Sequence, residues 1–415
     1  MAPQESWNAT VLVGQSGGPT AAINATLAGV FECAHQLGAR VLGMRNGIEG
    51  VLAGRVVDLD GLLSDPLQLD LLRRTPASLL GSCRYKLPDP DGDTAPFERL
   101  FSRFETLGVD AVLYIGGNDS MDTIEKLARY GERAGSPIRF MGVPKTIDND
   151  MVGTDHTPGY GSAAKFVACA VKEVARDSAA YFLKSVTVVE IMGRDAGWLT
   201  AASTLAGRPG AGGPDIILLP EAPLDVDAFV AAVEGLLEER DTVVVAASEG
   251  VVRADGEPLF RDESVGIDAF GHVATQSGVG RYLAALVKGR LGVKTRAVEF
   301  STLQRCASHL ASATDLEEAS TLGGVAVQAA KDGCTGMVPV MRREHNRPYS
   351  VSYGLSAISA VANRVRPVPA EWIRPDGMGV TDEMREYVRP LIQGEAAPTF
   401  VEGLPWHLWL PEEDA

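Results

Sequence analysis

The sequence predicts an α/β protein with mostly parallel sheets that are covered by helices on both faces. Short apolar segments typical of buried strands recur along the chain and alternate with helical stretches. Several of these strands are followed by turns rich in glycine, aspartate or asparagine. Because ligands of such sheets gather at the carboxyl ends of strands, the pattern also indicates an enzyme.

The expected strands and helices follow one another in a regular order. Residues 11–13 form the first strand, and a helix over residues 21–37 follows it. A strand over residues 111–115 and a helix over residues 121–130 repeat this plan. Four further strands are expected, over residues 138–143, 186–191, 216–220 and 242–247.

Length and composition limit the class of protein. At 415 residues the chain exceeds one hydrophobic core, so we expect two domains. No apolar run reaches membrane-spanning length and the first ten residues do not resemble a secretory leader, which predicts a cytoplasmic protein without a membrane partner. The 38 basic and 54 acidic residues give a net charge of −16, which disfavours nucleic acid as a partner. An anionic substrate therefore needs a local basic pocket.

The most informative segment lies at the end of the predicted strand 138–143. Residues 142–150 read G-V-P-K-T-I-D-N-D and so combine Lys145 with the carboxylates Asp148 and Asp150. A strand that ends in this cluster presents an acid–base group, potential metal ligands and a cation to one crevice. Phosphoryl transfer needs this combination, because its barrier falls mainly through positioning and charge neutralisation. A polar loop before a helix is the alternative interpretation.

Two glycine-rich turns offer places for phosphate groups. The turn Ser16-Gly17-Gly18 lies between a strand and a helix, where backbone N–H groups can surround an anion. It matches neither the Walker A loop nor the G-x-G-x-x-G fingerprint. The second turn, over residues 116–120, adds oxygen ligands for a hard cation such as Mg²⁺. By itself, the first turn is often only a tight connection, and a helix cap would explain the second turn equally well.

Together these segments resemble the phosphofructokinase family. The turn at Gly17-Gly18, residues 116–120, P-K-T-I-D-N-D, M-G-R-D-A-G-W over residues 192–198 and L-Q-R over residues 303–305 occur in the family's order and spacing. The resemblance implies the phosphofructokinase fold, with two Rossmann-like three-layer α/β/α domains. It implies a phosphoryl-donor domain from residues 1–157 and 305–355. The sugar-phosphate domain would contain residues 158–304 and 356–415, with a C-terminal helical extension.

The resemblance also implies roles for individual residues. Asp148 would be the base that takes the proton of the sugar 1-hydroxyl, and Asp150 would organise charge around Mg²⁺ and the transferred group. Arg84 would lie near the transferred phosphoryl group. Arg296 and Arg305 would bind the 6-phosphate. Arg296 would reach it from a neighbouring subunit of a homodimer or homotetramer. The implied substrate-binding positions are Gly18, Thr146, Met192, Gly193, Arg194, Glu249, Arg296, Thr302 and Arg305.

Two positions bear on the phosphoryl donor. Relatives that use ATP usually carry glycine at both positions, whereas this chain has Asp119 and Lys145. A carboxylate and a long side chain fill space where a nucleotide's α-phosphate would lie, and Lys145 can neutralise the remaining diphosphate. The pair resembles that of the pyrophosphate-dependent members.

We therefore expect pyrophosphate and fructose 6-phosphate to react reversibly to fructose 1,6-bisphosphate and phosphate, in glycolysis or gluconeogenesis. An ATP-dependent enzyme is the nearest alternative. A non-catalytic, phosphate-sensing subunit is a third, but it would not need the base that Asp148 supplies.

Several positions depart from the family pattern. Asn118 replaces an aspartate associated with the metal, so its effect on that site stays open. Thr302 replaces an aromatic or imidazole side chain near the sugar, and Ser185 replaces a second cross-subunit arginine, for which Lys184 could substitute. Because these two changes touch the acceptor pocket, sedoheptulose 7-phosphate is an alternative acceptor. Residues 24–32 contain no basic side chain, so activation by a nucleotide is not expected.

Overall fold

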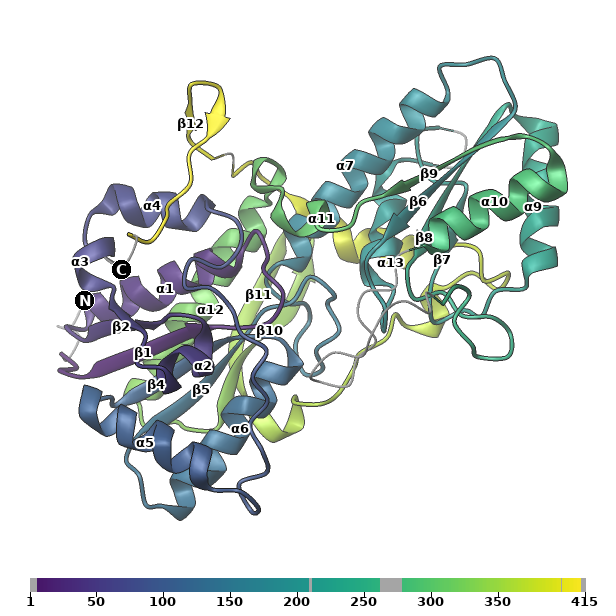
Figure 1. The fold of residues 1–415 in the computed structure, drawn as a ribbon. Coiled ribbons are helices and arrows are strands. Elements are labelled where there is room, and N and C mark those ends of the chain that lie inside the picture. Colours follow the sequence, from purple (N-terminus) through teal and green to yellow (C-terminus); the bar gives the residue numbers. More distant parts are fainter. Residues whose placement is uncertain (1–5, 209–210, 262–277, 397, 412–415) are drawn as a thin grey trace.

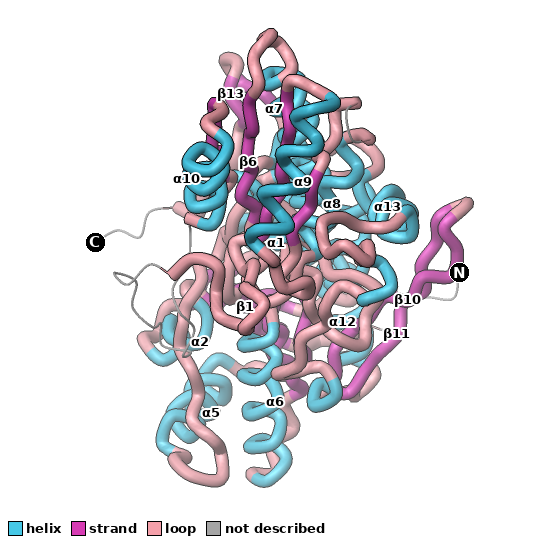
Figure 2. Tube along the Cα trace, turned by 90° about the vertical axis from the view of Figure 1, so that its right-hand side faces the viewer, coloured by secondary structure: helices cyan, strands magenta, loops and turns pink. Residues whose placement is uncertain are grey.

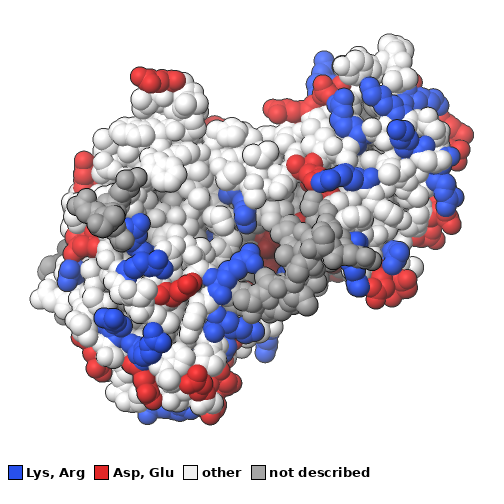
Figure 3. Space-filling model, viewed as in Figure 1, with Lys and Arg blue, Asp and Glu red and all other residues white. Residues whose placement is uncertain are grey.

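The computed structural model describes residues 6–208, 211–261, 278–396 and 398–411. The chain forms two lobes, each built around one sheet (Figure 1). The larger sheet has seven strands and the smaller one has four. On the face drawn in Figure 3, acidic and basic side chains are interspersed over both lobes. Among the helices of the described ranges, none is both long and apolar enough to cross a membrane.

Seven strands form the larger sheet: β1 (Thr10–Gln15), β2 (Arg40–Met44), β3 (Val56–Asp58), β4 (Ala111–Gly116), β5 (Arg139–Pro144), β10 (Met337–Asn346) and β11 (Tyr349–Ala357). Their order is β11-β10-β5-β4-β1-β2-β3. All neighbouring pairs are parallel except β2–β3 and β10–β11. The β10–β11 hairpin extends along one side of the molecule (Figure 2). The sequence predicted β1, β4 and β5 but not the other four strands.

Helices cover both faces of this sheet. One face carries α1 (Ile23–Gln36), α4 (Pro66–Arg74) and α12 (Ala313–Lys331), and the other carries α2 (Gly47–Leu52), α5 (Ala95–Leu107) and α6 (Asn118–Arg133). The short helix α3 (Asp60–Leu63) precedes α4.

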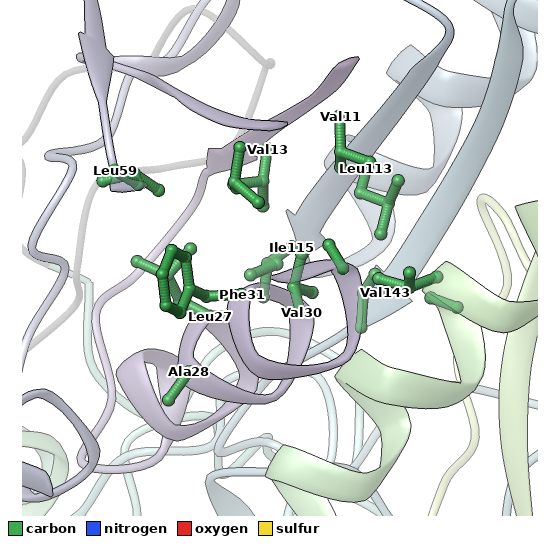
Figure 4. Packing of buried hydrophobic residues seen from close by; sticks show 14 of the residues in the cluster. Val11, Val13, Leu27, Ala28, Val30, Phe31, Leu59, Leu113, Ile115 and Val143 are labelled. Atoms are coloured by element: carbon green, nitrogen blue, oxygen red, sulfur yellow. The ribbon is translucent and has the colours of Figure 1, made fainter. Parts of the chain in front are cut away.

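Alternation along the strands assigns side chains to the two faces. Val11 and Val13 of β1 lie in the core that α1 covers, Val13 opposite Leu27 and Phe31 (Figure 4), whereas Leu12 belongs to the opposite core. Full burial of such a side chain contributes about 1.5–3 kcal/mol. The three buried apolar side chains of β1, Val11, Leu12 and Val13, therefore hold this strand between two helical layers.

The smaller sheet is entirely parallel. Its strands are, in spatial order, β7 (Ile216–Leu218), β8 (Thr242–Ser248), β6 (Ser185–Ile191) and β9 (Lys294–Glu299). One face carries α7 (Tyr160–Ser178), α8 (Trp198–Ala202) and α13 (Asp382–Val388), and the other carries α9 (Val226–Glu239) and α10 (Val279–Leu291). Each lobe is thus a three-layer α/β/α sandwich, which confirms the predicted fold class.

The segment after β11 returns to the smaller lobe, where α13 packs against the core that contains Trp198. A small hairpin of β12 (Phe400–Val401) and β13 (Leu404–Pro405) follows. The larger sheet takes its strands from residues 10–144 and 337–357, and the smaller from residues 185–299. The exact domain limits implied by the family stay a prediction.

The remaining short elements are α11 (Leu303–Cys306) and the 3-10 turns Ser203–Ala206, Ser308–Leu310, Ile358–Ala360, Ala370–Trp372 and Arg389–Ile392.

Candidate active site

A cavity of about 530 Å³ is lined by residues of both lobes. Its walls include the segments that follow β1, β4 and β5 in the larger sheet and β6 and β8 in the smaller sheet. All of these lie at the carboxyl ends of parallel strands, where the sequence analysis placed the site. The predicted site residues that line the cavity are Gly18, Arg84, Asn118, Asp119, Lys145, Thr146, Asp148, Asp150, Met192, Arg194, Glu249 and Arg305.

The glycine turn after β1 is held in place by hydrogen bonds from the Lys145 side chain. The Lys145 ammonium donates hydrogen bonds to the backbone carbonyls of Ser16 (3.0 Å) and Gly18 (2.6 Å). Its side chain is buried, and this burial lowers the pKa of Lys145 to about 8, although the nearby Asp148 carboxylate opposes the shift. Lys145 is thus part of the structure of the turn as well as a cation beside the cavity. No sequence pattern predicts these two hydrogen bonds.

Gly18 leaves room for Arg305 of α11. A Cβ atom at position 18 would lie 3.2 Å from Arg305 Nη1, tighter than an ordinary van der Waals contact. The arginine therefore lies beside the turn that the sequence analysis assigned to phosphate binding. Its positive charge favours an anionic substrate in this part of the cavity.

The segment after β5 carries two carboxylates into the cavity. Thr146 Oγ1 donates to Asp148 Oδ2 (3.2 Å) and accepts from the Asp148 backbone N–H (3.2 Å). Burial raises the pKa of Asp148, and the negative charge of Asp195 adds to this effect. Burial and the Asp148 charge together raise the pKa of Asp150 to about 7. Carboxylates with raised pKa values suit general base catalysis near neutral pH.

Asn149 sets the shape of this segment. Its φ of +55° lies in the left-handed region, which asparagine tolerates better than most residues. Its Oδ1 accepts from the Thr157 N–H (3.1 Å), and its Nδ2 donates to the Tyr387 hydroxyl (2.9 Å). Asn149 is fully buried, whereas Asp148 and Asp150 on either side of it reach the cavity. Sequence reasoning missed Tyr387, because it lies 238 residues further along the chain.

Asn118 and Asp150 form a candidate Mg²⁺ site. Asn118 Nδ2 donates to Asp150 Oδ2 (3.3 Å), whereas the buried Asn118 Oδ1 has no hydrogen-bond partner. A free amide oxygen beside a carboxylate suits Mg²⁺, which commonly binds one or two carboxylates together with substrate phosphates. Within the described ranges, no cluster of three His, Cys, Asp or Glu side chains could hold a metal ion. The residues therefore fit a cation that is shared with a bound substrate.

The smaller lobe supplies the other wall. Met192, Arg194 and Asp195 follow β6, and Glu249 follows β8. The Gly193 N–H donates to Glu249 Oε1 (3.4 Å), and burial raises the pKa of Glu249 to about 7. Arg194 forms an ion pair with Asp195 (2.8 Å). Gly193 does not line the cavity, but its backbone orients the carboxylate that does.

Two predicted residues lie away from the cavity in the single chain. Arg296 on β9 is half exposed and pairs with Asp177 (2.8 Å). Thr302 precedes α11 and is exposed. Lys184, the suggested substitute for a second arginine, donates to the Leu237 carbonyl (2.6 Å). Their roles at the sugar phosphate stay predictions.

The phosphofructokinase family model matches residues 10–330. The chain belongs to the phosphofructokinase family. This membership confirms the resemblance drawn from the motifs, and it accounts for the two sandwiches around one shared cavity.

Similarity to individual proteins extends over almost the whole chain. It is 43% identical over 406 residues to pyrophosphate–fructose 6-phosphate 1-phosphotransferase of Xanthomonas campestris pv. campestris (strain B100), covering 97% of this chain and 96% of that protein. Identity to the Halomonas elongata protein of the same name is 39% over 396 residues, with coverage of 94% and 93%. A crystal structure of pyrophosphate-dependent phosphofructokinase from Nitrosospira multiformis superimposes with a TM-score of 0.87 at 36% identity, covering 99% of both chains.

Proposed function

We propose that this chain transfers a phosphoryl group from pyrophosphate to the 1-hydroxyl of D-fructose 6-phosphate. The products are fructose 1,6-bisphosphate and phosphate. The observation that carries the proposal is one cavity in which Asp148 lies with the pair Asp119 and Lys145. Two relatives at 43% and 39% identity bear the name of this activity. The reaction is reversible because pyrophosphate and the product ester are similar in energy, so it serves glycolysis or gluconeogenesis.

Asp148 acts as the general base. Its carboxylate takes the proton of the 1-hydroxyl while the hydroxyl oxygen forms a bond to phosphorus. The bond between that phosphorus and the bridging oxygen of pyrophosphate breaks, and phosphate leaves. Glu249 and Arg194 hold the sugar phosphate, and Arg305 neutralises its phosphate group.

Lys145 and Asp119 select the donor. The Lys145 ammonium lies against the turn that holds pyrophosphate and stabilises the negative charge of the transition state. The Asp119 carboxylate, in the first turn of α6, repels the α-phosphate that ATP would place there. Arg84, on the wall of the same cavity, contacts the transferred group.

Mg²⁺ is the expected cofactor. Asn118 Oδ1 and the Asp150 carboxylate would hold it, because the amide oxygen is buried without a partner and the carboxylate is its neighbour. When bound, the cation neutralises charge on the phosphates. The hydrogen bond that Asn118 Nδ2 donates to Asp150 would keep the two ligand groups oriented toward the cation.

A homodimer or homotetramer would allow Arg296 to reach the site of a neighbouring subunit. Its half-exposed position on β9 supports this assignment. A cytoplasmic location and the lack of nucleotide activation also stay predictions. No nucleic acid partner is proposed, given the net charge of −16.

A coupled assay tests the proposed function. The purified protein is given fructose 6-phosphate and Mg²⁺ with pyrophosphate, with ATP or without a donor, and fructose 1,6-bisphosphate and released phosphate are measured. We expect product with pyrophosphate, one phosphate per bisphosphate, and almost none in the other two arms. Equal rates with ATP would contradict the donor, and no product in any arm would contradict the activity. A further arm with sedoheptulose 7-phosphate tests the alternative acceptor.

A further inference from the structure

Residues 365–368, here called the strap, connect the two walls of the cavity. The Arg366 backbone N–H donates to the Asp150 carbonyl (2.6 Å). On the other side, Trp198 Nε1 donates to the Arg366 carbonyl (2.8 Å). Trp198 is the first residue of α8 and ends the motif that follows β6. Arg366 of the strap is therefore bonded both to the Asp150 backbone and to α8. Residues 192–197, which precede α8 and include residues that line the cavity on the side of the smaller lobe, are here called the sugar-side loop.

The Arg366 guanidinium reinforces this connection. Nη1 donates to the carbonyls of Thr154 (3.0 Å) and Asp155 (2.5 Å), and Nη2 donates to the Asn149 carbonyl (3.0 Å). Its Cζ atom lies 4.5 Å from the centre of the Trp198 ring, which is a cation–π distance. Arginine suits this position because its planar guanidinium presents five donors in a fixed geometry, which lysine lacks.

Tyr387 of α13 completes the arrangement. Its hydroxyl donates to the Asp155 carbonyl (2.7 Å) and accepts from Asn149 Nδ2 (2.9 Å) and Arg366 Nη2 (3.3 Å). The Tyr387 ring also packs on Trp198, with ring centres 5.3 Å apart. These contacts fix the position of the Arg366 guanidinium.

A carboxylate joins the strap to the sugar-side loop a second time. Glu221 Oε1 accepts from the Gly197 N–H (2.9 Å) and from the Val368 N–H (2.9 Å). At the other end of the strap, Val365 and Met151 form an antiparallel bridge. The strap is thus bonded to the segment that carries Asp148 and Asp150 at one end and to the sugar-side loop at the other.

We propose that Arg366 is a positioning residue for phosphoryl transfer, one that keeps the Asp148–Asp150 segment aligned with the sugar-side loop. This inference rests on the proposed function. Arg366 lies outside residues 10–330, which the family model matches, and it does not line the cavity. The hydrogen bonds of its guanidinium go to backbone carbonyls and to one tyrosine hydroxyl, so its loss alters where the carboxylates lie and leaves the substrate-binding charges in place.

Kinetics of Arg366→Ala and Arg366→Lys test the proposal, with Arg374→Ala as the matched control. Arg374 belongs to the same C-terminal segment but pairs with Asp376 at the surface, away from the cavity. Because a displacement of about 1 Å can cost about a hundredfold in rate, we expect kcat of Arg366→Ala with pyrophosphate to fall by about that factor. KM for pyrophosphate should change by less than about threefold, since its ligands remain. Arg366→Lys should recover part of kcat, and Arg374→Ala should match the wild type.

Thermal unfolding and circular dichroism establish which variants are folded, and kcat is expressed per folded molecule. If Arg366→Ala does not fold, Tyr387→Phe replaces it, because only one hydroxyl is lost and kcat should still fall. A kcat equal to that of the Arg374→Ala control, in whichever variant folds, would overturn the proposal. So would a rise in KM with unchanged kcat, which would make Arg366 a binding residue. A wild-type protein inactive with pyrophosphate would instead contradict the proposed function itself.

Discussion

Asp148 reaches the cavity from a segment whose backbone is hydrogen-bonded on both sides. Thr146 holds its carboxylate, and the buried Asn149 beside it is bonded to Thr157 and Tyr387. These contacts leave the carboxylate little freedom. A base that is held in place before the substrate arrives avoids the cost of reorganisation during the reaction.

Replacement of Asp148 by asparagine tests its role as the base. Asn keeps the size of the side chain and a hydrogen bond with Thr146 but cannot accept the proton. General base catalysis contributes about 10²–10⁴-fold, so Asp148→Asn should lower kcat by at least about a hundredfold. KM for fructose 6-phosphate should stay within about threefold of the wild-type value. A kcat near that of the wild type in steady-state assays would exclude Asp148 as the base.

The pH profile of kcat/KM depends on groups with shifted pKa values. Glu249, with a pKa of about 7, must be ionised to hold the sugar, so kcat/KM should fall as the pH falls through about 7. Lys145, with a pKa of about 8, must be protonated, so kcat/KM should also fall as the pH rises through about 8. Because the pH dependence of kcat/KM reports the pKa values of the free enzyme, we expect a narrow bell-shaped profile with its maximum between these two values. A rate that stays constant to about pH 10, where an ordinary lysine titrates, would contradict the role of Lys145.

At the scale of elements, the central strands were the most predictable. The segments of β1, β4 and β8 contain continuous apolar runs, because parallel strands are buried on both faces, and β6 is mostly apolar for the same reason. β9, with the sequence K-T-R-A-V-E, mixes charged and apolar residues because it lies at the edge of its sheet, and it was missed. The location of the site followed from the central strands, since their carboxyl ends meet at one edge of each sheet.

The residues whose hydrogen bonds hold the walls of the site in place could not be predicted from the sequence in the same way. Lys145 was recognised as a cation, but its bonds to the Ser16 and Gly18 carbonyls join residues more than a hundred positions apart. Arg366 and Tyr387 lie in a segment without any recognised motif. Contacts of this kind depend on how separate elements pack, and the periodicity of one sequence does not record them.

A buried charged network connects α12 to the segment after β5. His156 Nδ1 lies 2.7 Å from Asp155 Oδ2, and its Nε2 lies 2.7 Å from Glu318 Oε2. Burial alone would lower the pKa of His156, but the two carboxylates outweigh it and raise the pKa to about 9. The folded protein therefore holds a charged imidazolium between two carboxylates.

This network predicts a pH dependence of stability. Because the folded pKa of about 9 exceeds the unfolded value of about 6.5, the stabilisation is fully present below about pH 6.5 and is lost as the pH rises through about 9. A shift of this size corresponds to about 3 kcal/mol. The free energy of unfolding of the wild type should therefore fall relative to that of His156→Gln over this range. Parallel curves for the two proteins in denaturant titrations would show that His156 is not charged in the folded state.

On the scale of the whole molecule, the position of Arg296 bears on assembly. β9 lies at the edge of the smaller sheet, and the Arg296 side chain is half exposed outside the cavity of its own chain. If it binds the 6-phosphate, it does so in the site of a neighbouring subunit. Assembly and sugar binding would then depend on the same residue.

Mixing two impaired variants tests this arrangement. Arg296→Ala should raise KM for fructose 6-phosphate by at least about tenfold, because a charge-assisted contact contributes about 1.5–3 kcal/mol. Mixed with Asp148→Asn, it should regain part of the activity, since some hybrid sites combine an intact Asp148 with an intact Arg296. No recovery, with exchange of subunits verified, would show that each site is complete within one chain.

Donor choice depends on the cavity as a whole and is decided by Asp119 and Lys145 together. Asp119→Gly removes volume and negative charge, so measurable ATP-dependent activity should appear in this variant. Lys145→Gly should lower turnover with pyrophosphate by orders of magnitude, because the cation that stabilises the transition state is gone.

The most direct measurement is kcat/KM for pyrophosphate divided by kcat/KM for ATP in the unaltered chain. We expect a ratio of at least about a thousand, equivalent to about 4 kcal/mol of differential transition-state stabilisation. A ratio near one would contradict pyrophosphate as the selected donor.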